Sequence, residues 1–144
     1  MSRIISLGTD LCDMRRIEAA IDRFGMRFLD RVFTTEERAH AERRNGAARI
    51  GTYAKRWAAK EACAKALGTG FSGGVFHSDI GVRNRPGGAP MLVLTGGAAA
   101  HLDRMTPAGM TIDMQLSLTD EHPYALAQVL FQALSQDERR ASAP

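Results

Sequence analysis

Four alanines recur every four residues in the middle of the chain, at Ala54, Ala58, Ala62 and Ala66. Residues four apart lie on one face of an α-helix, and the surrounding Lys, Glu and Ala residues favour a helix over residues 48–67. Gly68 follows where a left-handed helix cap is expected. Because alanine side chains are small, this helix is expected to pack closely against a β-sheet.

Alternating apolar and polar residues predict the strands of that sheet. Residues 110–118 alternate strictly, which is typical of a strand with one buried face. Residues 3–9 read as a strand, and residues 80–82 and 91–94 flank a Pro-Gly-Gly turn as in a β-hairpin. Residues 124–134 suit a helix or a strand, and periodicity alone does not choose between them.

The remaining segments are predominantly helical. Apolar residues at helical spacing predict a helix over residues 14–30, which Gly25 weakens. Thr34 and Glu37 have the spacing of a capping box, and residues 98–104 suit a short helix. This order predicts an α+β fold in one domain, residues 1–134, with a flexible tail at residues 135–144.

Charge and composition exclude several classes of protein. The net charge of +3 and the nine scattered aromatic residues do not favour a nucleic-acid binder. No run approaches the ~20 apolar residues of a membrane span, and no signal peptide is apparent. Cys12 and Cys63 are isolated, which favours free buried thiols over a disulfide. A cytoplasmic protein without a membrane anchor is therefore expected.

The predicted central helix also carries the residues best suited to chemistry. Trp57, Glu61, Lys65 and Gly68 share one face, and Arg56 and Lys60 form the adjacent row. A Glu and a Lys four residues apart are also compatible with an ordinary surface ion pair.

Asp10 is the second candidate, because it follows Gly8-Thr9 at the end of a predicted strand. With Glu61 it would supply the one or two carboxylates that Mg2+ takes from a protein. The alternative is that Asp10 caps the helix that follows.

Several segments together resemble the holo-acyl-carrier-protein synthases, which are 4'-phosphopantetheinyl transferases. Residues 56–70 are similar to the central helix of that family almost throughout. Shorter similarities are found at Ile5-Ser6-Leu7-Gly8-Thr9-Asp10-Leu11 with Arg16-Ile17, Arg31-Val32-Phe33-Thr34-Thr35-Glu36-Glu37, Asp79-Ile80, Gly88-Ala89-Pro90, Ser117-Leu118-Thr119 and Tyr124-Ala125. The resemblance runs from about residue 4 to residue 131 and favours a strand at residues 124–131.

The resemblance implies the phosphopantetheinyl transferase fold, with a long helix on an antiparallel sheet, assembled as a homotrimer with active sites between subunits. It implies transfer of 4'-phosphopantetheine from coenzyme A to a serine of apo-acyl carrier protein, releasing adenosine 3',5'-bisphosphate, in support of fatty acid biosynthesis. Magnesium would be held by Asp10 and Glu61, and Lys65 would act with Glu61 in catalysis. The expected coenzyme A-binding residues are Arg56, Lys60, Gly68, Gly70 and Pro90. Either a water held by the metal or Glu61 would accept the serine proton.

The resemblance implies that an acidic acyl carrier protein docks on the first helix, where basic residues accompany an apolar stripe. The expected docking residues are Arg16, Arg23, Arg27 and Phe28. A solvated charged face is the alternative for this row.

The chain departs from the family at Thr119-Asp120, where many members carry a histidine, so no catalytic histidine is expected. His122 suits a turn, and the scattered His40, His77 and His101 suggest no role. The main rival function is a catalytically silent module that binds coenzyme A or carrier protein.

Overall fold

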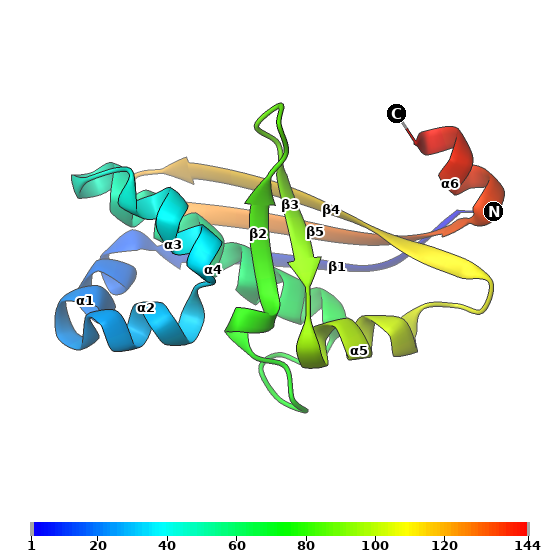
Figure 1. The fold of residues 1–144 in the computed structure, drawn as a ribbon, viewed down its shortest axis with the longest axis horizontal. Coiled ribbons are helices and arrows are strands. Elements are labelled where there is room, and N and C mark those ends of the chain that lie inside the picture. Colours follow the sequence, from blue (N-terminus) through cyan, green and yellow to red (C-terminus); the bar gives the residue numbers. More distant parts are fainter. Residues whose placement is uncertain (1, 144) are drawn as a thin grey trace.

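The structure is a computed structural model that describes residues 2–143, an α+β arrangement of two sheets and six α-helices within those residues (Figure 1). The strands are β1 (Arg3–Asp13), β2 (Ile80–Asn84), β3 (Pro90–Leu94), β4 (Met110–Glu121) and β5 (Tyr124–Ser135). The helices are α1 (Met14–Phe24), α2 (Met26–Val32), α3 (Thr35–Glu42), α4 (Gly46–Leu67), α5 (Gly96–Met105), α6 (Gln136–Ser142) and the 3-10 helix η1 (His77–Asp79).

The main sheet is antiparallel in the order β1-β5-β4, and β2 and β3 form a separate hairpin. Figure 1 shows α4 running along the main sheet, with α1 and α2 at one end of the molecule and α5 and α6 at the other. The predicted hairpin and antiparallel sheet are therefore confirmed. Although α4 has 22 residues, no helix within residues 2–143 is both long and apolar enough to cross a membrane.

The alanine face of α4 lies against the sheet, as predicted. Ala54, Ala58 and Ala62 are fully buried, and the buried residues at every second position of β5 are Ala125, Ala127, Val129, Phe131 and Ala133. The contact with β1 is especially close at Gly8, where an added Cβ would lie 1.8 Å from the Ala62 carbonyl oxygen. Only glycine fits there, so a Gly8 substitution would push α4 away from β1.

The single helix predicted for residues 14–30 is divided into α1 and α2. Gly25 adopts a φ of 57° between them, a backbone conformation that favours glycine. The strand β1 extends beyond its predicted end to Asp13. The Asp13 side chain accepts a hydrogen bond from the Arg15 backbone N–H at 3.0 Å and so caps α1.

The C-terminal part of the chain resolves one ambiguity and adds one helix. Residues 124–135 form the central strand of the main sheet, β5, which pairs with β1 and β4. The segment expected to be a flexible tail contains α6, which Ser135 and Glu138 open with a capping box. The same Ser-x-x-Glu spacing is visible in the sequence and is the signal that could have predicted this helix. Met1 and Pro144 lie outside the described residues.

One face of the main sheet carries exposed apolar side chains. Successive side chains of a strand point to opposite faces, so Leu7 and Leu11 lie on the face of β1 opposite to Gly8. Their exposed fractions are 62% and 60%. In the single chain, this face of β1 therefore leaves two large apolar side chains exposed to solvent.

Candidate active site

Asp10 and Lys65 meet where β1 packs on α4. Asp10 follows Gly8 by two residues and therefore shares its α4-facing side of β1. The Lys65 ammonium lies 3.2 Å from Asp10 Oδ1 and donates to the Thr9 carbonyl oxygen at 2.9 Å. Asp13, and not Asp10, caps the following helix, so the capping alternative for Asp10 is wrong. Because Asp13 caps the helix, the Asp10 carboxylate is available for another role.

The charge state of Asp10 reflects its surroundings. Burial raises the pKa of the Asp10 carboxyl, the charge of Glu61 adds to the increase, and Lys65 opposes it. Asp10 and Glu61 are therefore close enough for their charges to interact. Two carboxylates that repel one another in a partly buried site favour a bound cation.

The donor set at this site suits a hard cation with few protein ligands. Within residues 2–143, no group of three or more His, Cys, Asp and Glu side chains is arranged to hold a metal ion. Mg2+ typically takes one or two carboxylates and completes its octahedral shell with water and substrate phosphate. Asp10 and Glu61 match that requirement, and Lys65 adds a cationic group beside them.

Glu61 contacts a residue that was not predicted from the sequence to lie in the site. Its Oε1 lies 3.3 Å from His77 Nε2. The His77 ring stacks between Phe71, at 3.6 Å between ring centroids, and Trp57, at 4.8 Å. Because His77 lies 16 residues from Glu61 in a segment without a recognisable motif, only the folded chain reveals the contact.

Lys60 is not placed to bind coenzyme A, which corrects the prediction. Its side chain is fully buried, and its ammonium reaches Glu37 Oε1 at 2.7 Å, the Ile80 carbonyl oxygen at 2.7 Å and the His77 carbonyl oxygen at 3.2 Å. A lysine ammonium has three donors, so none remains for a ligand. Through its hydrogen bonds to the His77 and Ile80 carbonyl oxygens, Lys60 instead links η1 and β2 to α4.

Arg56 and Pro90, two of the expected coenzyme A-binding residues, lie together in a cavity of about 220 Å³. The other lining residues are His40, Arg44, Thr52, Lys55, Asn84, Gly88 and Leu118. Arg56 Nη2 lies 3.4 Å from Asn84 Oδ1, whereas Arg56 Nε is buried without a hydrogen-bond partner in the described chain. Burial and the nearby arginines lower the pKa of His40. The cavity is thus strongly basic and suits a phosphate.

The predicted site residues form two separate groups. Glu61 contacts His77, just before β2, whereas Arg56 contacts Asn84, the last residue of β2. A strand of this length spans about 13 Å. Gly68 and Gly70 follow Lys65 at the end of α4 and belong to the Glu61 group, because Gly68 donates its N–H to the Lys65 carbonyl oxygen. One chain therefore carries two sites at opposite ends of β2. The carboxylate site contains Asp10, Glu61 and Lys65, and the basic cavity is the one lined by Arg56 and Pro90.

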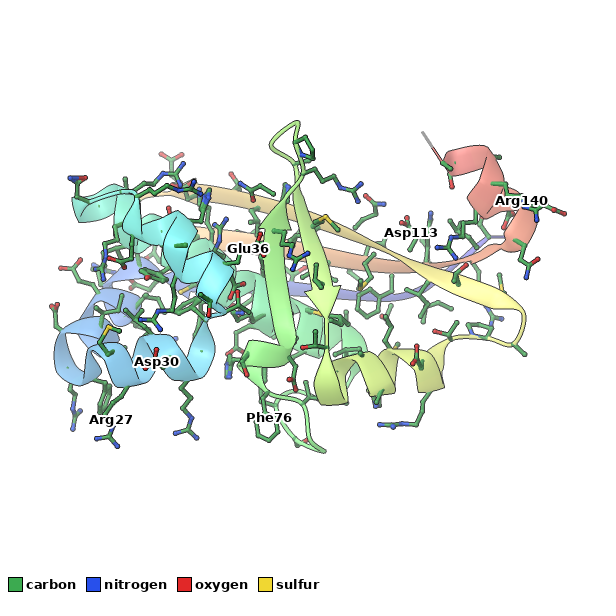
Figure 2. The ribbon with its side chains drawn as sticks, viewed as in Figure 1. Arg27, Asp30, Glu36, Phe76, Asp113 and Arg140 are labelled. Atoms are coloured by element: carbon green, nitrogen blue, oxygen red, sulfur yellow. The ribbon has the colours of Figure 1, made fainter. Side chains whose placement is uncertain are left out.

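The predicted docking residues divide between α1 and α2. Phe24, Arg27, Phe28 and Arg31 line an open cavity of about 310 Å³. Arg27 extends outward from α2, away from the sheet (Figure 2). Arg16 lies at the start of α1, where its charge acts on the Asp10 carboxyl. This surface combines aromatic rings with a basic rim beside the carboxylate site.

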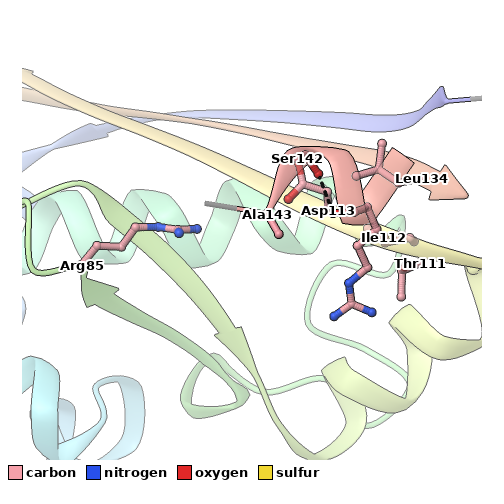
Figure 3. Close-up of a pocket in the computed structure, with 8 residues that line it drawn as sticks. Arg85, Thr111, Ile112, Asp113, Leu134, Ser142 and Ala143 are labelled. Carbon is pink, nitrogen blue, oxygen red and sulfur yellow. Dashed lines mark hydrogen bonds between the residues drawn. The ribbon is translucent and has the colours of Figure 1, made fainter. Parts of the chain in front are cut away.

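A further cavity of about 390 Å³ lies between α6, β4 and the tip of the β2–β3 hairpin. Figure 3 shows its lining, with Arg85 on the hairpin side and Ser142 and Ala143 on α6 and just after it. None of the predicted site residues contributes to it.

Comparison with known proteins links this geometry to one family. The family model of the 4'-phosphopantetheinyl transferase superfamily matches residues 6–129. A holo-[acyl-carrier-protein] synthase of Granulibacter bethesdensis is 66% identical over 131 residues, covering 91% of this chain and 90% of the relative. The corresponding synthase of Sphingopyxis alaskensis is 60% identical over 131 residues, covering 91% and 98%.

Solved structures are similar as well. The crystal structure of holo-[acyl-carrier-protein] synthase from Neisseria meningitidis matches with a TM-score of 0.78 at 32% identity, covering 90% of this chain and 98% of that one. The structure of the Bacillus anthracis synthase in complex with coenzyme A (3',5'-ADP) matches with a TM-score of 0.72 at 32% identity, covering 90% and 96%.

Proposed function

The chain belongs to the 4'-phosphopantetheinyl transferase superfamily, and we propose that it catalyses the reaction for which its relatives are named. It transfers the 4'-phosphopantetheine arm of coenzyme A to a serine of apo-acyl carrier protein. The serine oxygen forms a bond to the β-phosphorus while the bond from that phosphorus to the bridging pyrophosphate oxygen breaks. The serine proton passes to water or to Glu61, and adenosine 3',5'-bisphosphate leaves. The convergence of Asp10, Glu61 and Lys65 carries this proposal, because the reaction moves negative charge onto a phosphate leaving group.

Each residue of the carboxylate site has a role in that reaction. Asp10 and Glu61 would hold Mg2+, which when bound neutralises charge on the pyrophosphate. Lys65 is more than half exposed, and Asp10 and Thr9 account for two of its three donors. The remaining donor is available to a phosphate oxygen, where it stabilises charge as the leaving group departs. The glycines at 68 and 70 keep the adjacent backbone free of side chains.

The function is tested by weighing the carrier protein after incubation with the chain, coenzyme A and Mg2+. Transfer adds ~340 Da to the carrier protein, the mass of a covalently attached phosphopantetheine arm. A gain that disappears with chelator supports the proposal. Coenzyme A binding without any gain on several carrier proteins supports the rival, a silent binding module.

The two groups of site residues favour an active site shared between subunits. Under this proposal the chain is a homotrimer, in which the exposed Leu7 and Leu11 face of the sheet is covered by neighbouring copies. Coenzyme A then lies between the carboxylate site of one subunit and the basic cavity of the next. Arg56 and Pro90 bind the adenosine end there, and the buried, unpaired Arg56 Nε is a donor for its phosphate.

Mixed trimers test the shared site. Glu61→Ala and Arg56→Met subunits are each expected to form poorly active homotrimers, because each removes one half of every site. When they are co-expressed, the purified mixed trimers should recover about a third of the wild-type activity, since one of the three interfaces in every mixed trimer has both halves intact. Activity is measured on purified mixed trimers carrying two different affinity tags. No recovery in folded mixed trimers would place both halves in one subunit.

The aromatic and basic surface on α1 and α2 is the proposed docking site for the acidic carrier protein. The ring of Phe28 lies 6.0 Å from that of Trp57, which stacks on His77 beside Glu61. A carrier protein seated at Phe28 is therefore close to the carboxylate site. Arg16, Arg23 and Arg27 provide positive charge around the same surface, which favours association with an acidic partner.

Reversing one of these charges should weaken the binding of the carrier protein and leave the binding of coenzyme A unchanged. Arg27→Glu is expected to raise the KM for carrier protein about tenfold or more at low salt, because like charges then face one another. The KM for coenzyme A should stay unchanged. Arg104→Glu on α5 is the matched control, since Arg104 is equally a surface arginine but lies on another helix. Equal effects of the two variants would indicate a general charge effect and contradict docking at Arg27.

The cytoplasm is the proposed location. Cys12 and Cys63 are buried free thiols, and burial raises the pKa of Cys12 to about 11 and that of Cys63 to about 12. Thiols in this state are unreactive and are typical of proteins in reducing compartments.

A further inference from the structure

His77 is held in place on both faces of its ring. The Phe71 and His77 rings are nearly parallel, at an interplanar angle of 10°, and Trp57 covers the opposite face at 20°. Tilting of the imidazole out of this stack is therefore restricted. Only the ring edge can interact with polar groups.

The backbone of His77 is also anchored. Its carbonyl oxygen accepts a hydrogen bond from the buried Lys60 ammonium at 3.2 Å. Two residues later, the Asp79 side chain accepts a hydrogen bond from the Phe76 N–H at 3.2 Å, and the Asp79 carbonyl accepts one from the Thr95 N–H at 2.9 Å. The short helix η1 is thus joined to α4 and to the hairpin, and it presents His77 from a rigid support.

The fixed ring edge points at the carboxylate of Glu61. Nε2 lies 3.3 Å from Oε1 of Glu61, and the side chains are 24% and 27% exposed. A ring nitrogen that carries a proton donates to the carboxylate and fixes its orientation. The bond uses Oε1 and leaves Oε2 for a ligand. A carboxylate that binds a cation commonly depends on a neighbouring donor of this kind.

We propose that His77 is a positioning residue, which donates from Nε2 to Glu61 Oε1 and holds this carboxylate in the orientation that binds the divalent cation. This role rests on the function proposed above. It is distinct from catalysis, because His77 acts through Glu61 and the reacting atoms need not touch it.

Two substitutions separate the hydrogen bond from the aromatic stack. His77→Phe keeps an aromatic ring between Phe71 and Trp57 but has no N–H. His77→Gln has an amide N–H near the position of Nε2 but loses the stack. His101→Phe, on α5 and outside the site, is the matched control for replacing a histidine by phenylalanine.

Metal binding is measured directly with Mn2+ by electron paramagnetic resonance, alongside kcat and the KM for coenzyme A. His77→Phe should weaken Mn2+ binding and lower kcat by about tenfold or more, with little change in KM. His77→Gln should restore part of both losses, and His101→Phe should behave as the wild type. The emission of Trp57, the only tryptophan, reports whether the stack persists in His77→Phe.

The inference is overturned if His77→Phe binds Mn2+ as tightly as the wild type. It is also overturned if His77→Gln and His77→Phe lose metal binding equally, because the stack and not the hydrogen bond would then matter. Failure of the wild-type protein itself to bind Mn2+ would instead refute the proposed metal site.

Discussion

Replacing Asp10 by Asn is expected to lower the rate of phosphopantetheine transfer by about 10³-fold, because a metal site typically contributes several kcal/mol to the stabilisation of the transition state. Glu61→Gln should have an effect of the same order, since the two carboxylates form one site. Both substitutions preserve side-chain size and one of the two acceptor oxygens, while they remove the negative charge. Transfer is measured by the mass of the carrier protein, and Mn2+ binding by paramagnetic resonance should be lost in both variants.

The same Asp10→Asn variant should be at least as stable as the wild type in the absence of metal. The pKa of Asp10 is raised in the folded chain, mainly by burial and secondarily by Glu61. A carboxyl with a raised pKa binds its proton more tightly in the folded state, so stability is lost as pH rises from the unfolded pKa through the folded one. At neutral pH the ionised Asp10 therefore disfavours folding, and Asn removes that cost.

Asp103→Asn is the control, because Asp103 is an exposed aspartate on α5. It should retain full activity and an unchanged melting temperature. Functional residues often reduce stability, so loss of activity without loss of stability is the signature of a working site. If Asp10→Asn lowered the melting temperature by several degrees, Asp10 would be a structural residue and its assignment would be wrong.

Repetitive local patterns made much of the fold predictable. The alanines of α4 predicted its packing face, and strict alternation predicted β4, because both patterns follow from helix and strand geometry. The strand β5 was not predictable from periodicity. Its residues suit a helix equally well, and pairing on both sides with β1 and β4 decides the outcome. Tertiary contacts therefore select the strand, and these contacts cannot be read from the local sequence.

Gly25 shows a second limit of the sequence. Glycine in a helical pattern either weakens the helix or ends it, and the residue type alone does not distinguish the two. Here Gly25 takes a positive φ and directs the chain from α1 into α2. The break gives the proposed docking surface two short helices in place of one long helix.

The site was predictable where residues lie on one helix face, and less so elsewhere. Glu61 and Lys65 lie one helical turn apart, so their proximity follows from spacing. His77 reaches Glu61 only because η1 folds back on α4. Lys60 was expected at coenzyme A only through the family resemblance, and its buried partner, Glu37, lies 23 residues away. Whether a charged side chain is buried depends on the whole fold, so it cannot be predicted from the neighbouring residues.

Removing one partner of the buried pair formed by Lys60 and Glu37 is expected to be strongly destabilising. Both side chains are fully buried. Glu37 Oε1 also accepts from the Thr34 N–H at 2.8 Å, and Oε2 from the Val82 N–H at 2.8 Å. Burial lowers the pKa of Lys60, whereas the charge of Glu37 opposes this effect. The hydrogen bonds of both side chains are satisfied, and the pair joins α3, α4 and β2.

Lys60→Met should lower the free energy of unfolding by about 3–5 kcal/mol, because it leaves a buried carboxylate without its counter-charge. That is a large fraction of the stability of a typical domain. Lys55→Met, which removes a partly exposed lysine paired with Asp120 at 3.4 Å, should cost at most about 1 kcal/mol. Both values are measured by urea denaturation with Trp57 fluorescence.

The double variant Lys60→Met, Glu37→Gln distinguishes pairing from simple packing. The introduced glutamine is neutral, and its amide oxygen can still accept a hydrogen bond from Thr34 or Val82. The double variant should therefore be more stable than Lys60→Met alone, because the unpaired buried charge is gone. Equal or lower stability would mean that the Lys60 stem, rather than its charge, supports η1. In either case His77 should shift, because the bond that anchors its carbonyl is lost, so both variants should also bind Mn2+ more weakly than the wild type.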